Sequence, residues 1–270
     1  MVTIGCGGGG AMRRHLDHAW RVFATGFSFF VFGLAGLVLG LVVFPVLSVV
    51  VRHGETRTRV CRETISWTFR RFVGLMRGLG LLRYDLIEFE RLDRRGLLVL
   101  ANHPSLIDTV FLLGFIRNCT CVVDEHLFEN RFTARPLVAA GFIRNSAGTD
   151  VFTQCIAALD AGLNVLIFPE GTRTRLDGVI RLRRGAANIA VRAERNVTPV
   201  IIRCTPRTLV KGEKWWQVPP RPPSFSLRVG DDIAVQSFSH EEDAPALAVR
   251  RLTAHLEQYF TSESVAHAVP

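Results

Sequence analysis

Residues 22–51 contain thirty consecutive positions without a charged side chain, and this run constrains the fold more than any other feature. Arg21 and Arg52 bound it. A run longer than about 18 apolar residues can cross a bilayer. As one helix, this segment would reach about 45 Å, whereas the hydrocarbon core of a membrane is about 30 Å thick. We expect a membrane-embedded helical segment, either one tilted span or a re-entrant helical hairpin; it is too long for a cleaved signal peptide.

Basic residues are distributed unevenly around this segment. Lysine and arginine number three in residues 1–21 and six in residues 52–71. Because basic flanks are retained on the cytoplasmic side, this excess places the rest of the chain in the cytoplasm. Residues 59–83 then mix arginines with Trp67 and other apolar side chains, which is typical of a basic amphipathic helix in the headgroup region. The alternative is a helix packed on the protein with its arginines in water.

The overall charge points to an anionic partner. The formal net charge is +9 and the isoelectric point is about 10.1. Basic chains often bind nucleic acid, but 48% hydrophobic residues and a positive mean hydropathy favour a membrane surface and not nucleic acid. The six cysteines are scattered, without a CxxC pair or a histidine at zinc spacing. We therefore expect reduced thiols, no disulfide, no metal and no cofactor.

From residue 84 onward, short apolar runs alternate with helical patterns. This alternation predicts an α/β fold with a mixed, partly parallel sheet flanked by helices. The expected strands are residues 84–89, 96–101, 119–123, 163–168, 200–204 and 225–229, and the expected helices are residues 109–116, 151–161, 185–194 and 244–260. The expected organisation is a flexible basic N-terminus (1–20), a membrane anchor with an interfacial helix (21–83), a catalytic domain (84–235), and a C-terminal helix and tail (236–270).

The first candidate site follows the apolar run at residues 96–101. Pro104 ends the run, so His103 is expected at the carboxyl end of a strand, the edge where open α/β sheets bind ligands. Ser105 is placed to cap the next helix, with Asp108 in its first turn. A neutral imidazole suits the removal of a hydroxyl proton near pH 7, and a carboxylate five residues on could hold its tautomer. The plainer alternative is that Asp108 only completes a capping box with Ser105.

The second candidate site, Phe168-Pro169-Glu170-Gly171-Thr172-Arg173, also follows an apolar run that predicts a buried strand. It is therefore expected at the same sheet edge as His103. Gly171 would let the backbone approach a ligand closely, and Glu170 could accept a hydrogen bond from a hydroxyl. Arg173 could bind an anion through its planar fork. The alternative is a surface turn carrying a solvated charge pair.

Three segments occur in a characteristic order: Asn102-His103-Pro104-Ser105-Leu106-Ile107-Asp108, then residues 168–173, then Val197-Thr198-Pro199-Val200. Over residues 84–230 this pattern resembles the glycerolipid (lysophosphatidic-acid-type) acyltransferase superfamily. The resemblance implies transfer of a fatty acyl group from a thioester to a hydroxyl, with His103 as general base and Asp108 orienting it. It also implies a set of substrate-binding and fold-supporting residues: Glu170, Gly171, Thr172 and Arg173 for substrate, with Asn102 and Pro199 for support.

Residues 141–145 depart from the family pattern. The family commonly has Gly followed by Phe-Ile-x-Arg, with the arginine facing the phosphate of the acceptor. Here Asn145 occupies the place of that arginine, and Arg144 stands one residue earlier. Along a strand, an offset of one residue turns a side chain to the other face, which puts a phosphate-bearing acceptor in doubt. The aromatic and proline-rich residues 211–223 also resemble acyltransferases of aryl-polyene (xanthomonadin) pigment pathways.

We therefore expect a membrane-associated O-acyltransferase in the cell inner membrane, with its catalytic domain facing the cytoplasm. Its donor would be an acyl thioester of acyl carrier protein or coenzyme A. Its acceptor would be a lipid or glycerophosphate-type hydroxyl, or a non-phosphorylated molecule in polyene pigment assembly. We expect direct transfer without a serine nucleophile, since no G-x-S-x-G motif occurs. A non-catalytic membrane scaffold and a thioesterase are the competing functions.

Overall fold

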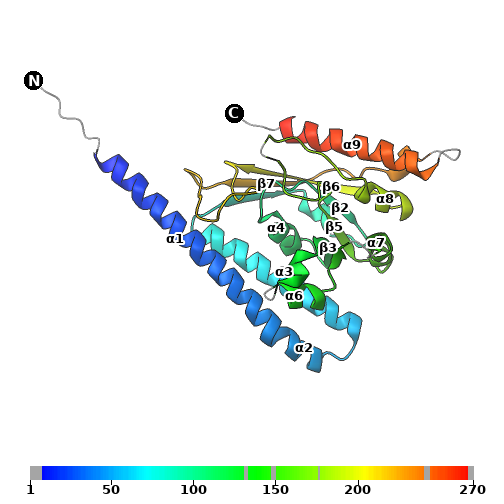
Figure 1. The fold of residues 1–270 in the computed structure, drawn as a ribbon, viewed down its shortest axis with the longest axis horizontal. Coiled ribbons are helices and arrows are strands. Elements are labelled where there is room, and N and C mark those ends of the chain that lie inside the picture. The colour runs from blue at the N-terminus through cyan, green and yellow to red at the C-terminus, as the bar shows by residue number, and fades with distance from the viewer. Residues whose placement is uncertain (1–7, 131–132, 147–149, 176, 240–243, 267–270) are drawn as a thin grey trace, which may run out of the picture.

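The computed structural model describes residues 8–130, 133–146, 150–175, 177–239 and 244–266. Its centre is a seven-stranded sheet in the order β1-β7-β6-β2-β5-β3-β4 (Figure 1). The strands are β1 (Arg83–Ile87), β2 (Leu98–Ala101), β3 (Cys119–Asp124), β4 (Ile143–Asn145), β5 (Asn164–Ile167), β6 (Val197–Thr205) and β7 (Ser224–Val229). The α-helices are α1 (Gly8–Val38), α2 (Phe44–Val50), α3 (Gly54–Gly78), α4 (Asp108–Phe115), α5 (His126–Glu129), α6 (Ala134–Ala139), α7 (Val151–Asp160), α8 (Gly185–Arg192) and α9 (Pro245–Ala266).

The sheet is mixed and mostly parallel. β6 and β7 pair antiparallel, and the other neighbouring strands pair parallel. β1 and β7 therefore run against the other five strands. The prediction of a mixed, partly parallel α/β sheet is confirmed. Since β2, β5, β3 and β4 are parallel neighbours, the segments that follow them all emerge at one edge, which we call the carboxyl edge.

Helices cover both faces of the sheet because its central strands are apolar on both sides. All four residues of β2 are buried, and successive side chains point to opposite faces. Val99 belongs to the cluster that holds Phe72 of α3 and Phe111 of α4, whereas Leu100 packs in the cluster that holds Leu252 of α9. The layer of α1, α3 and α4 thus lies on one side of the sheet and α9 on the other (Figure 1).

The charge-free segment forms part of one long helix. α1, a π-helical turn (Leu39–Val43) and α2 continue without a break, and the part from His15 to Val50 is long and apolar enough to cross a membrane. Only 17% of its most apolar window is buried, so the protein does not cover it as it covers a core helix. The chain reverses only after Val50, where α3 returns beside α1 and α2 (Figure 1). A hairpin folded within residues 22–51 is therefore wrong, because the helix does not break there.

Two segments expected to be flexible or loose are helical where the structure describes them. α1 begins at Gly8, so residues 8–20 continue into the apolar helix; residues 1–7 lie outside the described part of the chain. α9 extends to Ala266, beyond the expected end at residue 260. Once a helix is nucleated and packed, each added residue gains a hydrogen bond at little cost, so the helix extends past its apolar stretch.

The basic helix expected at residues 59–83 is α3, and its apolar face packs on the protein. Its buried residues are Cys61, Ile65, Phe72, Val73 and Met76. For this face, the alternative that the helix packs on the protein is therefore correct. On the outside, Trp67 is 53% exposed, and the Arg71 guanidinium lies 5.2 Å from its ring centroid. Contact of this exposed side with lipid headgroups stays a prediction.

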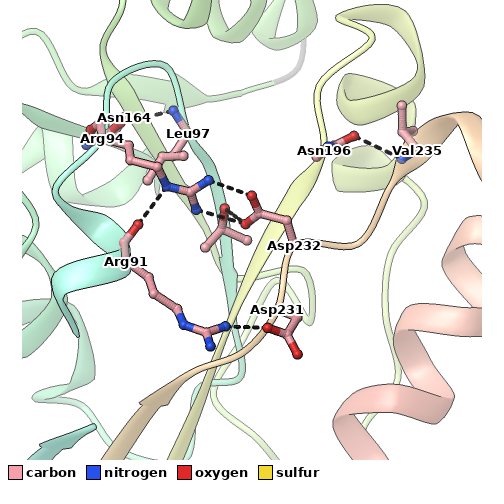
Figure 2. Close-up of polar contacts among 9 residues, drawn as sticks. Arg91, Arg94, Leu97, Asn164, Asn196, Asp231, Asp232 and Val235 are labelled. Carbon is pink, nitrogen blue, oxygen red and sulfur yellow. Dashed lines mark hydrogen bonds and ion pairs between the residues drawn. The ribbon is translucent and has the colours of Figure 1, made fainter. Parts of the chain in front are cut away.

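The opposite, amino edge of the sheet is closed by paired side chains (Figure 2). Arg94, before β2, donates to both carboxylate oxygens of Asp232, after β7, at 2.6 and 2.9 Å. Asn164, at the start of β5, accepts from the Leu97 amide at 3.0 Å and donates to the carbonyls of Arg94 and Arg117 at 3.0 Å each. These bonds join the ends of β2, β5 and β7.

Candidate active site

The loops that follow β2, β5, β3 and β4 surround a cavity of about 750 Å³ at the carboxyl edge. The expected site residues that line it are His103, Asn145, Gly171, Thr172 and Arg173. The expected site residues that lie outside its lining are Asn102, Asp108, Arg144, Glu170 and Pro199. The parallel topology thus brings the two sequence segments of residues 102–108 and 168–173 to one place, as strand ends of neighbouring parallel strands must.

His103 and Asp108 are in contact within the loop between β2 and α4. The imidazole Nδ1 lies 3.0 Å from Asp108 Oδ2. The same carboxylate oxygen accepts from the Ser105 amide at 2.6 Å. The contact with His103 fits the catalytic interpretation of Asp108, and the bond from the Ser105 amide fits its interpretation as part of a capping box. Because a carboxylate accepts from Nδ1–H, the arrangement favours the tautomer whose Nε2 can take up a proton.

The expected capping role of Ser105 is wrong. α4 begins at Asp108 with Ile107 as N-cap, and no side chain caps it. Ser105 Oγ is buried and has no hydrogen-bond partner in the described part of the chain. Only the Asp108 half of the capping box is present, because the Asp108 carboxylate accepts from the Ser105 amide while the serine hydroxyl accepts from no described amide of the helix.

The loop after β5, residues 168–174, contacts both the backbone and the imidazole of His103. Glu170 Oε1 accepts from the His103 amide at 2.9 Å and from Thr174 Oγ1 at 2.8 Å. The His103 carbonyl accepts from the Thr174 amide at 2.8 Å. Phe168 stacks on the imidazole, with ring centroids 4.2 Å apart. The His103 side chain is therefore 15% exposed, and Nε2 is the ring atom left to meet a molecule in the cavity.

Burial governs the electrostatics of both carboxyl groups. Complete burial raises the pKa of Asp108 above its ordinary value, against the lowering effects of the hydrogen bonds from His103 and Ser105. Burial also raises the pKa of Glu170, against the bonds from Thr174 and the His103 amide. In each case the loss of water outweighs the hydrogen bonds to the ionised form. Carboxyl groups with perturbed pKa values cluster at functional sites, so this edge is the leading candidate.

Glu170 lies at a different place from the one its expected role requires. A residue that accepts from the acceptor hydroxyl must reach the cavity, whereas Glu170 is buried and outside the lining. Its Oε1 instead joins the β2 loop to the β5 loop through His103 and Thr174. In this geometry Glu170 holds the His103 backbone by a hydrogen bond.

Gly171 and Arg183 form a pair that sequence reasoning did not single out. Gly171 has a φ of 67°, in the left-handed region that favours glycine. A Cβ placed there would lie 2.6 Å from Arg183 Nε, so only glycine lets this guanidinium lie across the loop. Arg183 lines the cavity, and the described residues offer its guanidinium no hydrogen bond or ion pair. Arginines are so frequent in residues 173–195 that the sequence carries no signal for this one.

Arg173 also lines the cavity, but part of its guanidinium is engaged. Nη1 donates to the carbonyls of Leu209 and Val210, at 2.8 and 3.0 Å. These bonds join the β5 loop to the segment after β6. The other N–H groups of Arg173 remain the donors that it can offer an anion.

Arg144 and Asn145, the two residues that depart from the family pattern, are neighbours in β4 and point to opposite faces of it. Asn145 lines the cavity, and Arg144 does not. The Arg144 guanidinium lies 4.6 Å from the Phe128 ring centroid, and its Nη1 lies 3.9 Å from Glu125 Oε1. The alternation of side chains along a strand accounts for the difference. The cavity therefore presents an amide at the position where the family commonly has an arginine.

Asn102 and Pro199 hold β2 against β6. Asn102 Nδ2 donates to the Ile202 carbonyl at 2.8 Å, and the Ile202 amide donates to Asn102 Oδ1 at 2.7 Å. The side chain thus continues the ladder where the β2 backbone turns away toward His103. Pro199 pairs with Leu100 in the register of β2 and β6, and its carbonyl accepts from the Gly230 amide at 2.9 Å. Both residues contact the β2–β6 pair, and their supporting role in catalysis stays a prediction.

The cysteines do not provide a nucleophile in this site. Cys121 is the cysteine in the described lining of the cavity, and burial raises the pKa of its thiol well above the ordinary value. Burial also raises the pKa of Cys119, Cys155 and Cys204 to about 12, so these thiols stay protonated and unreactive. Within the described residues, no three His, Cys, Asp or Glu side chains group as a metal site. The titratable groups that the described residues bring to the cavity, apart from cysteine, are the imidazoles of His103 and His126, the carboxyl group of Asp124, and the guanidinium groups of Arg173 and Arg183.

Comparison with known proteins identifies relatives. Residues 85–203 match the family model described as Acyltransferase. The chain is 27% identical over 168 residues to 1-acyl-sn-glycerol-3-phosphate acyltransferase of Pseudomonas aeruginosa, covering 60% of this chain and 62% of that protein. It is 27% identical over 161 residues to human 1-acyl-sn-glycerol-3-phosphate acyltransferase beta, covering 56% and 55%. The chain thus spans about three fifths of the length of the curated relatives that it matches.

A solved structure shares the fold. The crystal structure of the 1-acyl-sn-glycerophosphate (LPA) acyltransferase PlsC from Thermotoga maritima matches with a TM-score of 0.65 at 21% identity. The match covers 91% of this chain and 97% of that one, so the common architecture extends beyond the residues of the family model. Residues 85–203 therefore form a domain of the acyltransferase family.

Proposed function

We propose that this protein is a membrane-associated O-acyltransferase that moves a fatty acyl group from a thioester to a hydroxyl. The observation that carries the proposal is the His103–Asp108 contact of 3.0 Å, with the imidazole on the wall of the cavity. The relatives named as 1-acyl-sn-glycerol-3-phosphate acyltransferases support the reaction class. His103 acts as general base and Asp108 holds its tautomer, as in a triad that lacks the serine.

The proposed chemistry is a direct transfer. The acceptor hydroxyl gives its proton to His103 Nε2 while its oxygen attacks the thioester carbonyl carbon. The tetrahedral intermediate then expels the thiolate as the carbon–sulfur bond breaks, and His103 returns the proton to that sulfur. Arg173 and Arg183 bring guanidinium donors to the cavity where negative charge develops.

The acceptor that we propose is a hydroxylated lipid, with lysophosphatidic acid used less efficiently than an acceptor that needs fewer phosphate contacts. Asn145 supports this, since an amide stands on the cavity wall where the family commonly has an arginine. A buried phosphate dianion needs paired cations, and one nitrogen of Arg173 is committed to backbone carbonyls. An acceptor in polyene pigment assembly fits the same argument. Asn145→Arg should raise kcat/KM for lysophosphatidic acid, measured against the same variant with a non-phosphorylated monoacylglycerol.

The proposed attachment is through the long helix, with the catalytic domain on the cytoplasmic side of the inner membrane. Phe23 and Phe30 are 66% and 67% exposed on α1, a surface that water would not favour. Phe23→Asp with Phe30→Asp should shift the full chain from the membrane fraction to the soluble fraction in high salt. Val179→Asp, an exposed apolar site elsewhere on the domain, is the matched control and should stay bound. Membrane binding that survives the double change would reject this attachment.

Acceptor dependence separates an acyltransferase from a thioesterase and a scaffold. We expect the full chain in lipid nanodiscs to consume palmitoyl thioester only when a lysolipid or monoacylglycerol is present, and to form the matching ester by mass spectrometry. Free fatty acid released without an acceptor would identify a thioesterase. No consumption with either the coenzyme A or the carrier-protein thioester, by folded protein, would favour the scaffold.

A further inference from the structure

A second cavity, of about 880 Å³, lies beside the active site on the α9 side of the sheet. Five arginines line it, and we call it the basic groove: Arg83, Arg203, Arg207, Arg221 and Arg228. Its described lining contains no acidic, lysine or aromatic residue. Such a concentration of one sign of charge creates a field that attracts an anionic partner.

The strand register builds the groove. Arg83 of β1 pairs with Ser224 of β7, and Arg203 of β6 pairs with Ser226 of the same strand. Each of these small serines thus has an arginine on one neighbouring strand, and its partner on the other strand is Thr205 for Ser224 and Asp85 for Ser226. The five arginines come from three stretches of chain, at residues 83, 203–207 and 221–228, so the charge spreads over an area instead of converging on one point.

Acidic groups nearby neutralise only part of this charge. Arg228 pairs with the Glu263 carboxylate, and Arg203 donates to the Glu263 carbonyl, at the end of α9. Asp85 is exposed on β1 but does not line the groove. Arg83 and Arg221 are exposed, and the described residues offer their side chains no hydrogen bond or ion pair. These two arginines are the groove's available cations.

The groove and the active-site cavity share a thin wall. Asn102 and Pro104 line the groove, whereas His103 between them lines the active-site cavity. In the β5 loop, Thr174 lines the groove and Arg173 lines the cavity. Only the loops at residues 102–104 and 173–174 therefore separate a partner in the groove from the imidazole of His103.

Most of the groove lies on the face of the sheet opposite α3 and α4, and its Arg221 rim adjoins the segment that binds Arg21 of α1. It adjoins the end of α9 through Ser264, and α9 lies on the opposite side of the sheet from α1 and α3 (Figure 1). In a protein attached through α1, the Arg221 rim lies near α1, whereas the part of the groove beside Arg203, Arg228 and Ser264 lies on the sheet face turned away from α1, which favours a soluble anion over lipid headgroups. The anion that it attracts is thus a soluble one.

We propose that the basic groove docks the acidic face of a carrier protein that delivers the acyl thioester on a flexible arm. The inference rests on the proposed acyl transfer. A spread array of arginines suits an acidic protein surface, because such surfaces steer association by long-range charge. The nucleotide of coenzyme A would instead favour converging phosphate contacts and an aromatic face for its base, and the groove lining has no aromatic ring. The arm would then pass the loops at residues 102–104 and 173–174 to bring the thioester to His103.

The test compares two donors that carry the same acyl chain. Full-length protein in lipid nanodiscs is assayed with palmitoyl-acyl carrier protein and with palmitoyl-coenzyme A. Arg83→Glu with Arg221→Glu should raise KM for the carrier-protein donor by about tenfold or more, while kcat/KM with the coenzyme A donor changes less than about threefold. Arg250→Glu, on α9 and outside the groove lining, makes the same kind of charge change as a control and should alter neither.

Binding decides the inference independently of turnover. Fluorescence anisotropy of labelled holo-acyl carrier protein should give a salt-sensitive Kd that the groove variant weakens about tenfold and Arg250→Glu leaves unchanged. If no transfer occurs with either donor but this binding pattern holds, the proposed function fails and the docking surface stands. Unchanged binding by the groove variant, or an equal loss with both donors, overturns the carrier-protein assignment; the equal loss would point to the nucleotide.

Discussion

The two edges of the central sheet use polar side chains in opposite ways. At the amino edge, Arg94 meets both oxygens of Asp232 and Asn164 makes three hydrogen bonds (Figure 2). At the carboxyl edge, Ser105 Oγ and Asp108 Oδ1 are buried without partners among the described residues. Unpaired buried polar atoms are costly and are retained where function needs them. The comparison teaches that one edge stabilises the sheet and the other is kept ready for a ligand.

Of the changes at the two edges, we expect Asp108→Asn at the carboxyl edge to have the largest effect on the reaction. Replacement by Asn keeps the size of the side chain but removes the carboxylate that accepts from His103 Nδ1. The wrong tautomer then places a proton on Nε2, so we expect kcat to fall by about 10²–10⁴-fold. The steady-state rate with saturating acceptor measures this. Asp93→Asn, an exposed carboxylate at the other edge, should stay within about twofold of wild type, and a similar rate in both variants would contradict the assigned role.

At the amino edge, a change should affect stability and spare the chemistry. Asn164→Ala leaves the Leu97 amide and the carbonyls of Arg94 and Arg117 without their partner. Unmade hydrogen bonds at buried groups should lower the free energy of unfolding by about 2–4 kcal/mol. Denaturant titration measures that loss, while kcat of the folded protein should stay within about threefold. A large loss of kcat in folded Asn164→Ala protein would show that the two edges are coupled.

A third prediction tests whether Arg183, at the carboxyl edge, binds an anionic acceptor. Arg183→Gln removes an unpaired cation from the cavity wall, so KM for an anionic acceptor should rise by about tenfold, with a smaller change for an uncharged one. Arg184→Gln is the matched control, because Arg184 is exposed and outside the cavity lining. Michaelis–Menten measurements with lysophosphatidic acid and monoacylglycerol give both numbers. Equal KM values for the two arginine variants would remove Arg183 from the site.

The smallest expected effect concerns pH and Glu170. Burial raises the pKa of Glu170 in the folded state above its ordinary 4.5, so the folded protein binds this proton more tightly than the unfolded chain. Its contribution to stability is present at low pH and is lost as pH rises through the folded pKa. The stability of wild type relative to Glu170→Gln should therefore fall between pH 4.5 and pH 7.5, by denaturant titration at both values. The opposite sign would mean that the hydrogen bonds outweigh burial.

The strands were predictable because their apolar runs are short and bounded. Residues 96–101 and 163–168 become Leu98–Ala101 and Asn164–Ile167, with ends displaced by one or two residues. Placing His103 and Arg173 at one edge followed from these two strands alone. The long helix was less predictable at its ends, because packing carries a helix into residues such as 8–20 that look flexible by composition.

Parts of the site were beyond local patterns. Ser105 is a residue type that often caps helices, but in the fold α4 begins at Asp108, with Ile107 as N-cap and no side-chain cap. Glu170 looks like a ligand-binding residue, and only the packed loops reveal that it holds the His103 backbone. Arg183 is brought to Gly171 by the tertiary fold. Pairings of this kind depend on the angle at which loops leave the sheet, which no spacing in the sequence encodes.

The central claim is that the carboxyl edge performs acyl transfer through His103, and it is tested most directly by measuring rate and stability together on His103→Ala. The full chain in lipid nanodiscs would be assayed for acceptor-dependent ester formation and titrated with denaturant. The account predicts that kcat falls by about 10²–10⁴-fold while the free energy of unfolding stays within about 1 kcal/mol of wild type. Folded His103→Ala protein that retains kcat within a few-fold of wild type would contradict the claim.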